Sequence, residues 1–281
     1  MPLLCLSSPK GGVGKTMLAG SLAWELARLD MRVVALDLDP QNALRLHFGI
    51  SLRDDAGLMP VLRRDGAALG RWQGALRRTE SGVWLLPYGE ADLAGAMADA
   101  AMMAAANSPL GAVLDDILSD PHAILIVDTP PGPSAALRAV LPWADLVVTV
   151  LLADATSIAL LPVVEQGRAF GDWAGSGEPA RHGFVLNQVS PLSRLGQAAR
   201  TAAARHLGDR LLGTVTRDEC VAEAIASRSP VMAYAPNSRA AEDLAHLADV
   251  LADRLAAVAR QAMPSIAARA ARLSRYADQA W

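Results

Sequence analysis

Two lysines in one short segment are the side chains best suited to chemistry in this sequence. The 281 residues hold 26 lysines and arginines together, and only Lys10 and Lys15 are lysines. Both lie in the segment Lys10-Gly11-Gly12-Val13-Gly14-Lys15-Thr16. A lysine ammonium is a compact point charge, unlike the planar guanidinium that the rest of the chain uses. A glycine-rich loop with such lysines predicts a cradle for phosphate groups.

The flanking residues predict the elements that such a loop needs. The apolar run at residues 3–6 is typical of a buried strand, and the apolar residues of 15–28 have nearly helical spacing. A strand, loop and helix in this order point backbone N–H groups and a helix N-terminus at phosphates. We expect Lys15 to reach the β- and γ-phosphates and the Thr16 hydroxyl to bind Mg²⁺. Pro9 replaces the first glycine of the general pattern, which fits a variant with an extra lysine at position 10.

Carboxylates follow two further apolar runs. Residues 33–36 lead into Asp37 and Asp39, whose spacing on a strand would place both side chains on one face. Residues 123–127 lead into Asp128, as in a Walker B strand whose aspartate holds the Mg²⁺ shell. Taken alone, Asp37 and Asp39 are also compatible with solvated residues of a loop. After a phosphate loop, these carboxylates are placed to orient an attacking water and to hold metal-bound waters.

Together these segments resemble the deviant Walker A ATPases of the ParA/MinD class. Within that class, residues 41–49 and 72–89 resemble the BcsQ (YhjQ) family, the ATPase partners of bacterial cellulose synthase. The alternation of strands and helices predicts an α/β fold with a doubly wound, mostly parallel sheet and helices on both faces. The segments that carry the class resemblance are 10–16, 37–41, 126–132, 185–187, 216–218 and 222–247.

The resemblance implies a role for each site residue. Lys15 binds its own nucleotide, whereas Lys10 reaches into the opposite site of a dimer and neutralises charge in the transition state. Asp37 orients or activates the water, and Asp39 and Asp128 serve the metal together with Thr16. The expected ligands are ATP or ADP with Mg²⁺. The residues expected to bind the nucleotide are Lys10, Gly11, Gly12, Val13, Gly14, Lys15, Thr16, Met17, Asn187, Arg217 and Asp218.

Two residues depart from the pattern of the class. Met17 stands where a second hydroxyl residue usually contacts the α-phosphate, which removes a hydrogen bond worth about 1–3 kcal/mol if nothing replaces it. Thr216 replaces the proline that usually precedes the Arg-Asp pair on the adenine side. Both departures concern nucleotide affinity rather than the fold.

Composition agrees with one P-loop ATPase domain, expected at residues 1–262, and a basic amphipathic tail at 263–281. The apolar content of 52% is ample for a core, and the net charge of −3 gives no reason to expect specific DNA binding. The start of the chain does not read as a signal peptide, which favours a cytoplasmic location. The tail could lie on an anionic membrane, on a partner or on the domain itself, so recruitment to the inner membrane stays open.

The sequence therefore predicts a slow ATPase that acts as a switch and is stimulated by a partner. ATP would be clamped between the two protomers of a homodimer. The output would be assembly or positioning of the cellulose synthase complex, through its small or regulatory subunits. Two alternatives stay open, namely a ParA-type ATPase that partitions DNA or another cargo, and a scaffold that holds nucleotide without turnover.

Overall fold

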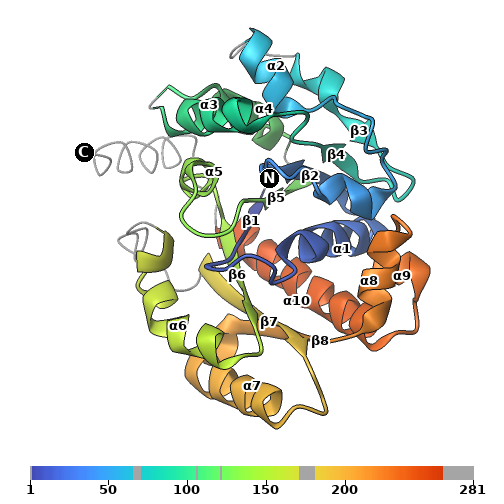
Figure 1. The fold of residues 1–281 in the computed structure, drawn as a ribbon, viewed down its shortest axis with the longest axis vertical. Helices are drawn as coiled ribbons and strands as arrows, with labels where there is room; N and C mark the ends of the chain where they lie inside the picture. Colours follow the sequence, from blue (N-terminus) through green and yellow to red (C-terminus); the bar gives the residue numbers. More distant parts are fainter. Residues whose placement is uncertain (1, 66–70, 106, 121, 171–180, 262–281) are drawn as a thin grey trace.

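Strands and helices alternate along most of the chain and build one eight-stranded sheet (Figure 1). The computed structural model describes residues 2–65, 71–105, 107–120, 122–170 and 181–261. The strands are β1 (Leu3–Ser7), β2 (Arg32–Asp37), β3 (Arg77–Arg78), β4 (Trp84–Leu86), β5 (Ala123–Asp128), β6 (Leu146–Leu152), β7 (His182–Val189) and β8 (Leu211–Thr216). Their order across the sheet is β3-β4-β2-β5-β1-β6-β7-β8, and every neighbouring pair is parallel except β3 with β4.

Ten α-helices are described, and they cover both faces of this sheet. The 3₁₀ turns are η1 (Leu44–Phe48), η2 (Trp72–Ala75), η3 (Arg168–Phe170) and η6 (Gly208–Arg210). The α-helices are α1 (Lys15–Arg28), α2 (Leu58–Asp65), α3 (Leu93–Ala104), α4 (Pro109–Leu118), α5 (Ala135–Val140), α6 (Ala155–Glu165), α7 (Arg194–Leu207), α8 (Glu219–Ala226), α9 (Val231–Tyr234) and α10 (Arg239–Gln261).

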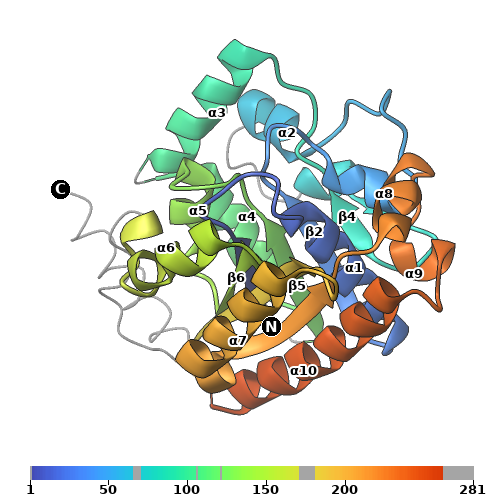
Figure 2. The ribbon, with the colours of Figure 1, turned by 60° about the horizontal axis from the view of Figure 1, so that its bottom comes forward.

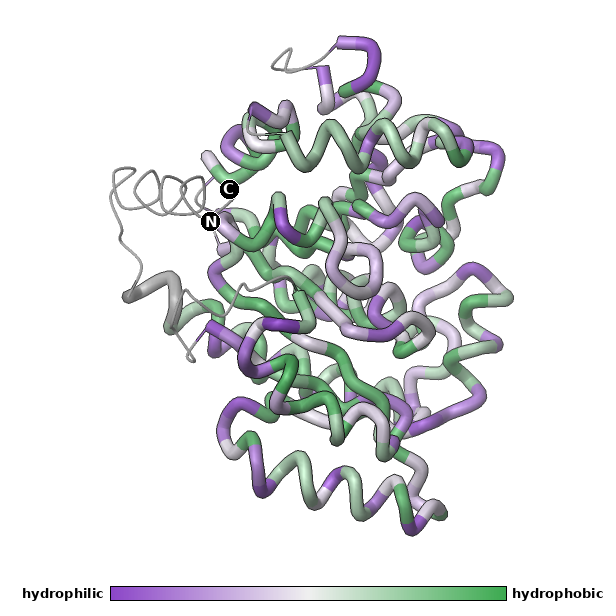
Figure 3. The backbone as a smooth tube through the Cα atoms, turned by 60° about the vertical axis from the view of Figure 1, so that its left-hand side comes forward, coloured by the Kyte–Doolittle hydropathy of each residue, from purple (hydrophilic) through white to green (hydrophobic). Residues whose placement is uncertain are grey.

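Alternation along the strands divides the core into two layers. Leu3 and Cys5 of β1 pack in the layer formed with α2 to α7, whereas Leu4 and Leu6 pack in the layer formed with α1, α8, α9 and α10. Figure 2 places α1 and α10 together on one side of the sheet, and Figure 3 shows hydrophobic segments running through the interior. Strands buried on both faces require such continuous apolar runs.

The structure confirms the predicted doubly wound, mostly parallel fold. Helix α1 has the predicted bounds, and the long C-terminal helix appears as α10. Leu29 follows the end of α1, and its side chain is 38% exposed. The predicted tail at 263–281 lies outside the described residues. Within the described part of the chain, no helix is both long and apolar enough to cross a membrane.

The parallel order determines where the site lies. The carboxyl ends of neighbouring parallel strands meet at one edge of the sheet, and ligands of such folds bind there. The strands β1, β2, β5, β7 and β8 bring the phosphate loop, Asp37, Asp128, Asn187 and Thr216 to this edge.

Candidate functional site

The segment between β1 and α1 has the geometry of a phosphate cradle. Gly12 and Gly14 adopt left-handed backbone conformations, with φ of +73° and +85°. Gly14 also has no room for a side chain, because a Cβ there would lie 2.3 Å from Nδ2 of Asn187. As the N-cap of α1, Gly14 provides no side-chain cap, so the first N–H groups of the helix are available to an anion.

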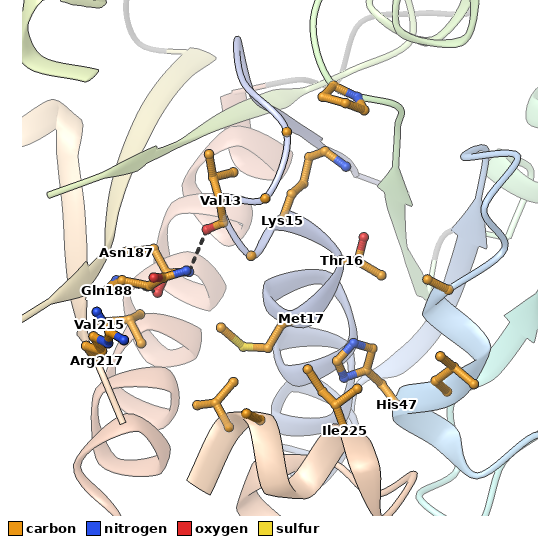
Figure 4. A pocket seen from close by; sticks show the side chains of 18 of the residues that line it. Val13, Lys15, Thr16, Met17, His47, Asn187, Gln188, Val215, Arg217 and Ile225 are labelled. Atoms are coloured by element: carbon orange, nitrogen blue, oxygen red, sulfur yellow. Dashed lines mark hydrogen bonds between the residues drawn. The ribbon is translucent and has the colours of Figure 1, made fainter. Parts of the chain in front are cut away.

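A pocket of about 520 Å³ opens at this loop (Figure 4). It contains all the residues expected to bind nucleotide, together with Asp39 of the expected metal set. Asp37 and Asp128 are absent from its lining. The residues expected to bind nucleotide are therefore gathered around one pocket. The predicted residues that line the pocket are Lys10, Gly11, Gly12, Val13, Gly14, Lys15, Thr16, Met17, Asp39, Asn187, Arg217 and Asp218.

A buried ion pair connects the phosphate loop to the sheet. The Lys15 ammonium lies 2.7 Å from Oδ1 of Asp128, and the Thr16 hydroxyl donates to Oδ2 of the same carboxylate at 2.6 Å. The side chain of Lys15 is 6% exposed and that of Asp128 is fully buried. Burial raises the pKa of Asp128, and the charge of Lys15 acts in the opposite direction. This carboxylate thus holds the two side chains that were predicted to act on phosphate and metal.

Asp37 and Asp39 differ in burial and in their position relative to the pocket. Strand β2 ends at Asp37, and the chain then turns, so that strand alternation does not extend to Asp39. Asp37 is fully buried, and its oxygens accept from the backbone N–H groups of Asp39 and Leu44 at 2.9 and 3.1 Å. Burial raises the pKa of Asp37 well above its usual value, and the nearby Asp128 carboxylate raises it further. Of the two, only Asp39 lines the pocket.

Lys10 pairs with a different carboxylate from Lys15. Its ammonium lies 3.0 and 3.4 Å from the two carboxylate oxygens of Asp154. Asp154 is also the N-cap of α6, where it accepts from the backbone N–H of Ser157 at 2.7 Å. Burial opposes ionisation here, but the bonds from Ser157 and Lys10 hold the pKa of Asp154 below its usual value. The two lysines of the loop therefore have separate carboxylate partners.

On the side expected to hold adenine, Asn187 supports the loop. Its Nδ2 donates to the backbone carbonyl of Val13 at 2.7 Å, as the dashed line in Figure 4 marks. Its Oδ1 accepts from the N–H of Gln188, a residue with φ of +55°. Asn187 thus positions the phosphate loop while lining the pocket, and its contact with adenine stays a prediction.

The loop after β8 accounts for one departure from the class. The N–H of Thr216 donates to Asp243 of α10 at 2.8 Å, a bond that proline could not form. Asp218 caps α8 through Oδ1, and its Oδ2 accepts from Ala240 at 3.4 Å. Asp218 therefore orders two helix starts at the pocket rim, while Arg217 reaches solvent with a 65% exposed side chain.

The floor of the pocket was not predicted from the sequence. His47 of η1 and Ile225 of α8 lie there near Met17 of α1 (Figure 4), and Val221 of α8 also lines the pocket. Burial lowers the pKa of His47 to about 4, so its ring is neutral at pH 7. A Cβ at Gly20 would lie 2.8 Å from the Cβ of His47. A glycine in the middle of a helix lowers stability by about 1 kcal/mol relative to alanine. Gly20 was therefore the one feature of the sequence that indicated close packing against this helix.

No group of three or more His, Cys, Asp and Glu side chains in the described ranges is arranged to hold a metal ion. Mg²⁺ is usually held by one or two protein oxygens with phosphate and water oxygens. Thr16, Asp39 and Asp128 have the oxygen chemistry for that arrangement.

Known proteins are similar to this chain in sequence and in fold. The chain is 30% identical over 259 residues to the chromosome-partitioning ATPase Soj of Thermus thermophilus, covering 90% of this chain and 96% of Soj. Cellulose biosynthesis protein BcsQ of Salmonella typhimurium is 27% identical over 250 residues, covering 89% and 93% of the two chains. The structure of the septum site-determining protein MinD of Pyrococcus horikoshii, complexed with Mg-ADP, superposes with a TM-score of 0.68 at 19% identity. That match covers 92% of this chain and 98% of MinD.

The fold and the phosphate loop define a P-loop ATPase of the ParA/MinD class. Residues 1–251 match the family of cellulose biosynthesis protein BcsQ, and the chain belongs to that family.

Replacing Lys15 tests the phosphate cradle. We expect Lys15→Ala to weaken ATP binding about a hundredfold or more, because about 2.7 kcal/mol of charge-assisted bonding is lost. Calorimetric titration with Mg-ATP measures the effect. Lys10→Ala is the matched control and should stay within about threefold of the original affinity, since Asp154 holds Lys10 outside the cradle. Equal losses in both variants, with unchanged melting temperatures, would contradict this assignment.

Proposed function

We propose that this protein is an ATP-dependent dimeric switch that assembles or positions a bacterial cellulose synthase complex. The main support for a switch is that the two lysines have different partners. Lys15 pairs with Asp128 in the interior, and Lys10 pairs with Asp154 at the surface. A site that only binds ATP needs the first lysine. The second is free to serve a neighbouring protomer once its ion pair opens. Membership of the BcsQ family supports the cellulose role.

Nucleotide loading begins at the buried ion pair. Phosphate oxygens compete with Asp128 for the Lys15 ammonium, while the N–H groups at the start of α1 bind the phosphate chain. Mg²⁺ would neutralise charge on the phosphates, and Thr16, Asp39 and Asp128 are the residues that would hold it, directly or through water. The base lies between Asn187 and the loop at Arg217.

We assign the attacking water to Asp39 rather than to Asp37. Asp39 lines the pocket, and one of its carboxylate oxygens accepts from the N–H of Gln41 at 3.0 Å. This bond orients the carboxylate and leaves the second oxygen for the water. Both oxygens of Asp37 are already engaged with backbone groups, so Asp37 fixes the path of the chain that presents Asp39.

Lys10 links hydrolysis to dimer formation. Its side chain is 27% exposed, and that of Asp154 is 37% exposed, so the pair costs little to open. Released from Asp154, the ammonium reaches the phosphates of the facing protomer and neutralises charge that develops in the transition state. Hydrolysis removes this attraction and the dimer separates.

The molar mass of the protein in solution, which reports its oligomeric state, tests the switch. We expect a dimer with a non-hydrolysable ATP analogue and mainly monomer with ADP, because only the triphosphate provides enough charge for two ammonium groups. Multi-angle light scattering on the same sample with each nucleotide measures this. The same mass in both states would exclude a nucleotide-driven dimer.

Paired substitutions separate the roles of the two aspartates. Asp39→Ala should retain ATP binding and dimerisation but release phosphate about a hundredfold more slowly, since the water loses its acceptor. Asp37→Ala should instead lower the free energy of unfolding by about 2–4 kcal/mol in urea, because two backbone N–H groups lose their acceptor. If Asp39→Ala hydrolyses ATP at the normal rate and Asp37→Ala is stable but inactive, then Asp37 is the residue that orients the water.

The amount of cellulose that host cells make tests the proposed role in cellulose synthesis. Host cells that carry Lys15→Ala in place of the original gene should make little cellulose, measured as dye-binding polymer per cell, with normal chromosome inheritance. The similarity to Soj motivates the opposite result, in which cellulose is normal and chromosomes are lost. That result, together with salt-dependent binding of the ATP form to nonspecific DNA, would favour a partitioning ATPase.

A further inference from the structure

His47 is a polar side chain that is buried in the wall of the nucleotide pocket. Of the five histidines of the chain, only His47 lines this pocket, and it is 5% exposed. Within the described ranges, no group forms a hydrogen bond with its ring, and burial alone shifts its pKa. A buried polar group without a partner lowers the stability of a fold. We therefore expect the partner of this ring to come from outside the chain.

The fold holds His47 against α1, one helical turn beyond Thr16. A Cβ at Gly20 would lie 3.0 Å from the Cγ of His47, so a side chain at position 20 would displace the ring. Gly20 follows Thr16 by four residues, and residues four apart lie on the same face of a helix. The start of η1 is fixed as well, because the N–H of Leu44 donates to Asp37 at 3.1 Å. The position of His47 is thus determined from two sides.

The pocket wall beside His47 offers few other side-chain donors. The thioether of Met17 cannot donate a hydrogen bond, and its sulfur accepts from the Ser21 hydroxyl at 3.5 Å. Figure 4 shows Met17 with His47 on one side and Asn187 on the other. The amide of Asn187 already donates to the carbonyl of Val13. The neutral imidazole of His47 carries one N–H group, which is available to a ligand.

The path of a nucleotide through the pocket determines what this N–H group would meet. With the β- and γ-phosphates at Lys15 and the base at Asn187, the ribose and the α-phosphate join these two ends next to Met17. Hydroxyl and phosphate oxygens are good acceptors for an imidazole N–H. The edge of the base fits less well, because Arg217 and His47 lie on opposite walls of the pocket (Figure 4).

We propose that His47 donates a hydrogen bond to an oxygen of the ribose or of the α-phosphate of the bound nucleotide. This bond fixes the segment that joins the base to the reacting phosphates, and it satisfies the buried ring. The proposal rests on the binding of ATP, which the class of the protein establishes. It does not depend on the proposed dimer switch.

Substitutions at position 47 separate the hydrogen bond from the packing of the ring. Calorimetric titration with Mg-ADP measures binding without hydrolysis. We expect His47→Phe, which keeps a ring and loses the N–H, to weaken binding about tenfold or more. The amides of His47→Asn and His47→Gln can donate at the depths of the two ring nitrogens, so one of them should stay within about threefold of the original affinity. His246→Phe, outside the pocket, is the matched control and should bind normally.

Modified nucleotides identify the acceptor oxygen. If the effect of His47→Phe disappears with 2′-deoxy-ADP or 3′-deoxy-ADP, the acceptor is the missing hydroxyl. If the effect persists with both and shrinks with one diastereomer of the α-thio analogue of ADP, the acceptor is the α-phosphate. An effect of full size with all of these analogues would overturn the proposal. Original affinity in His47→Phe, or equal losses in all three variants with unchanged melting temperatures, would also overturn it.

Nitrogen NMR of the histidine rings tests the same bond in the original sequence, whatever the stability of the variants. Saturation with Mg-ADP should shift the ring nitrogen signals of one of the five histidines, because the N–H of His47 gains an acceptor. A spectrum of histidine rings that does not change on saturation would contradict the proposal.

Discussion

The buried carboxylate of Asp128 is the contact on which the site depends. It lies at the end of β5 in the centre of the sheet, and it joins that strand to Lys15 and Thr16 of the phosphate loop. A buried charge is costly unless it is paired and hydrogen-bonded, so the loop must keep its lysine and its hydroxyl near this position. The left-handed glycines and the Asn187 bond to Val13 then fix the remaining path of the loop.

This arrangement makes nucleotide binding an exchange of ionic partners. In the switch that we propose, phosphates take Lys15 from Asp128 inside one protomer, and a facing nucleotide takes Lys10 from Asp154 at its surface. The ionic interactions of Lys15 are strong, because charges attract one another more strongly in apolar surroundings than in water. The surface pair is weaker, since both side chains are partly solvated. The proposed switch therefore makes nucleotide binding and dimer formation separate steps with different sensitivity to salt.

Much of this site could be predicted because it depends on local order. The strand before Lys10, the bounds of α1 and the end of β5 at Asp128 follow from runs of apolar residues. That Asp39 lines the pocket whereas Asp37 is buried could not be predicted, since the chain leaves β2 between them. His47 and Ile225 at the pocket floor depend on helix packing that no local pattern specifies.

The central claim is that Lys10 acts across the dimer, and mixing two inactive variants tests it most directly. Lys10→Ala keeps Asp39, and Asp39→Ala keeps Lys10, so one of the two sites in their heterodimer has both groups. Phosphate release from a mixture shown to contain heterodimer should exceed the sum of the separate variants severalfold, within the ~10–100-fold that we expect Lys10 to contribute. Release no greater than that sum would contradict a Lys10 that acts in the partner site.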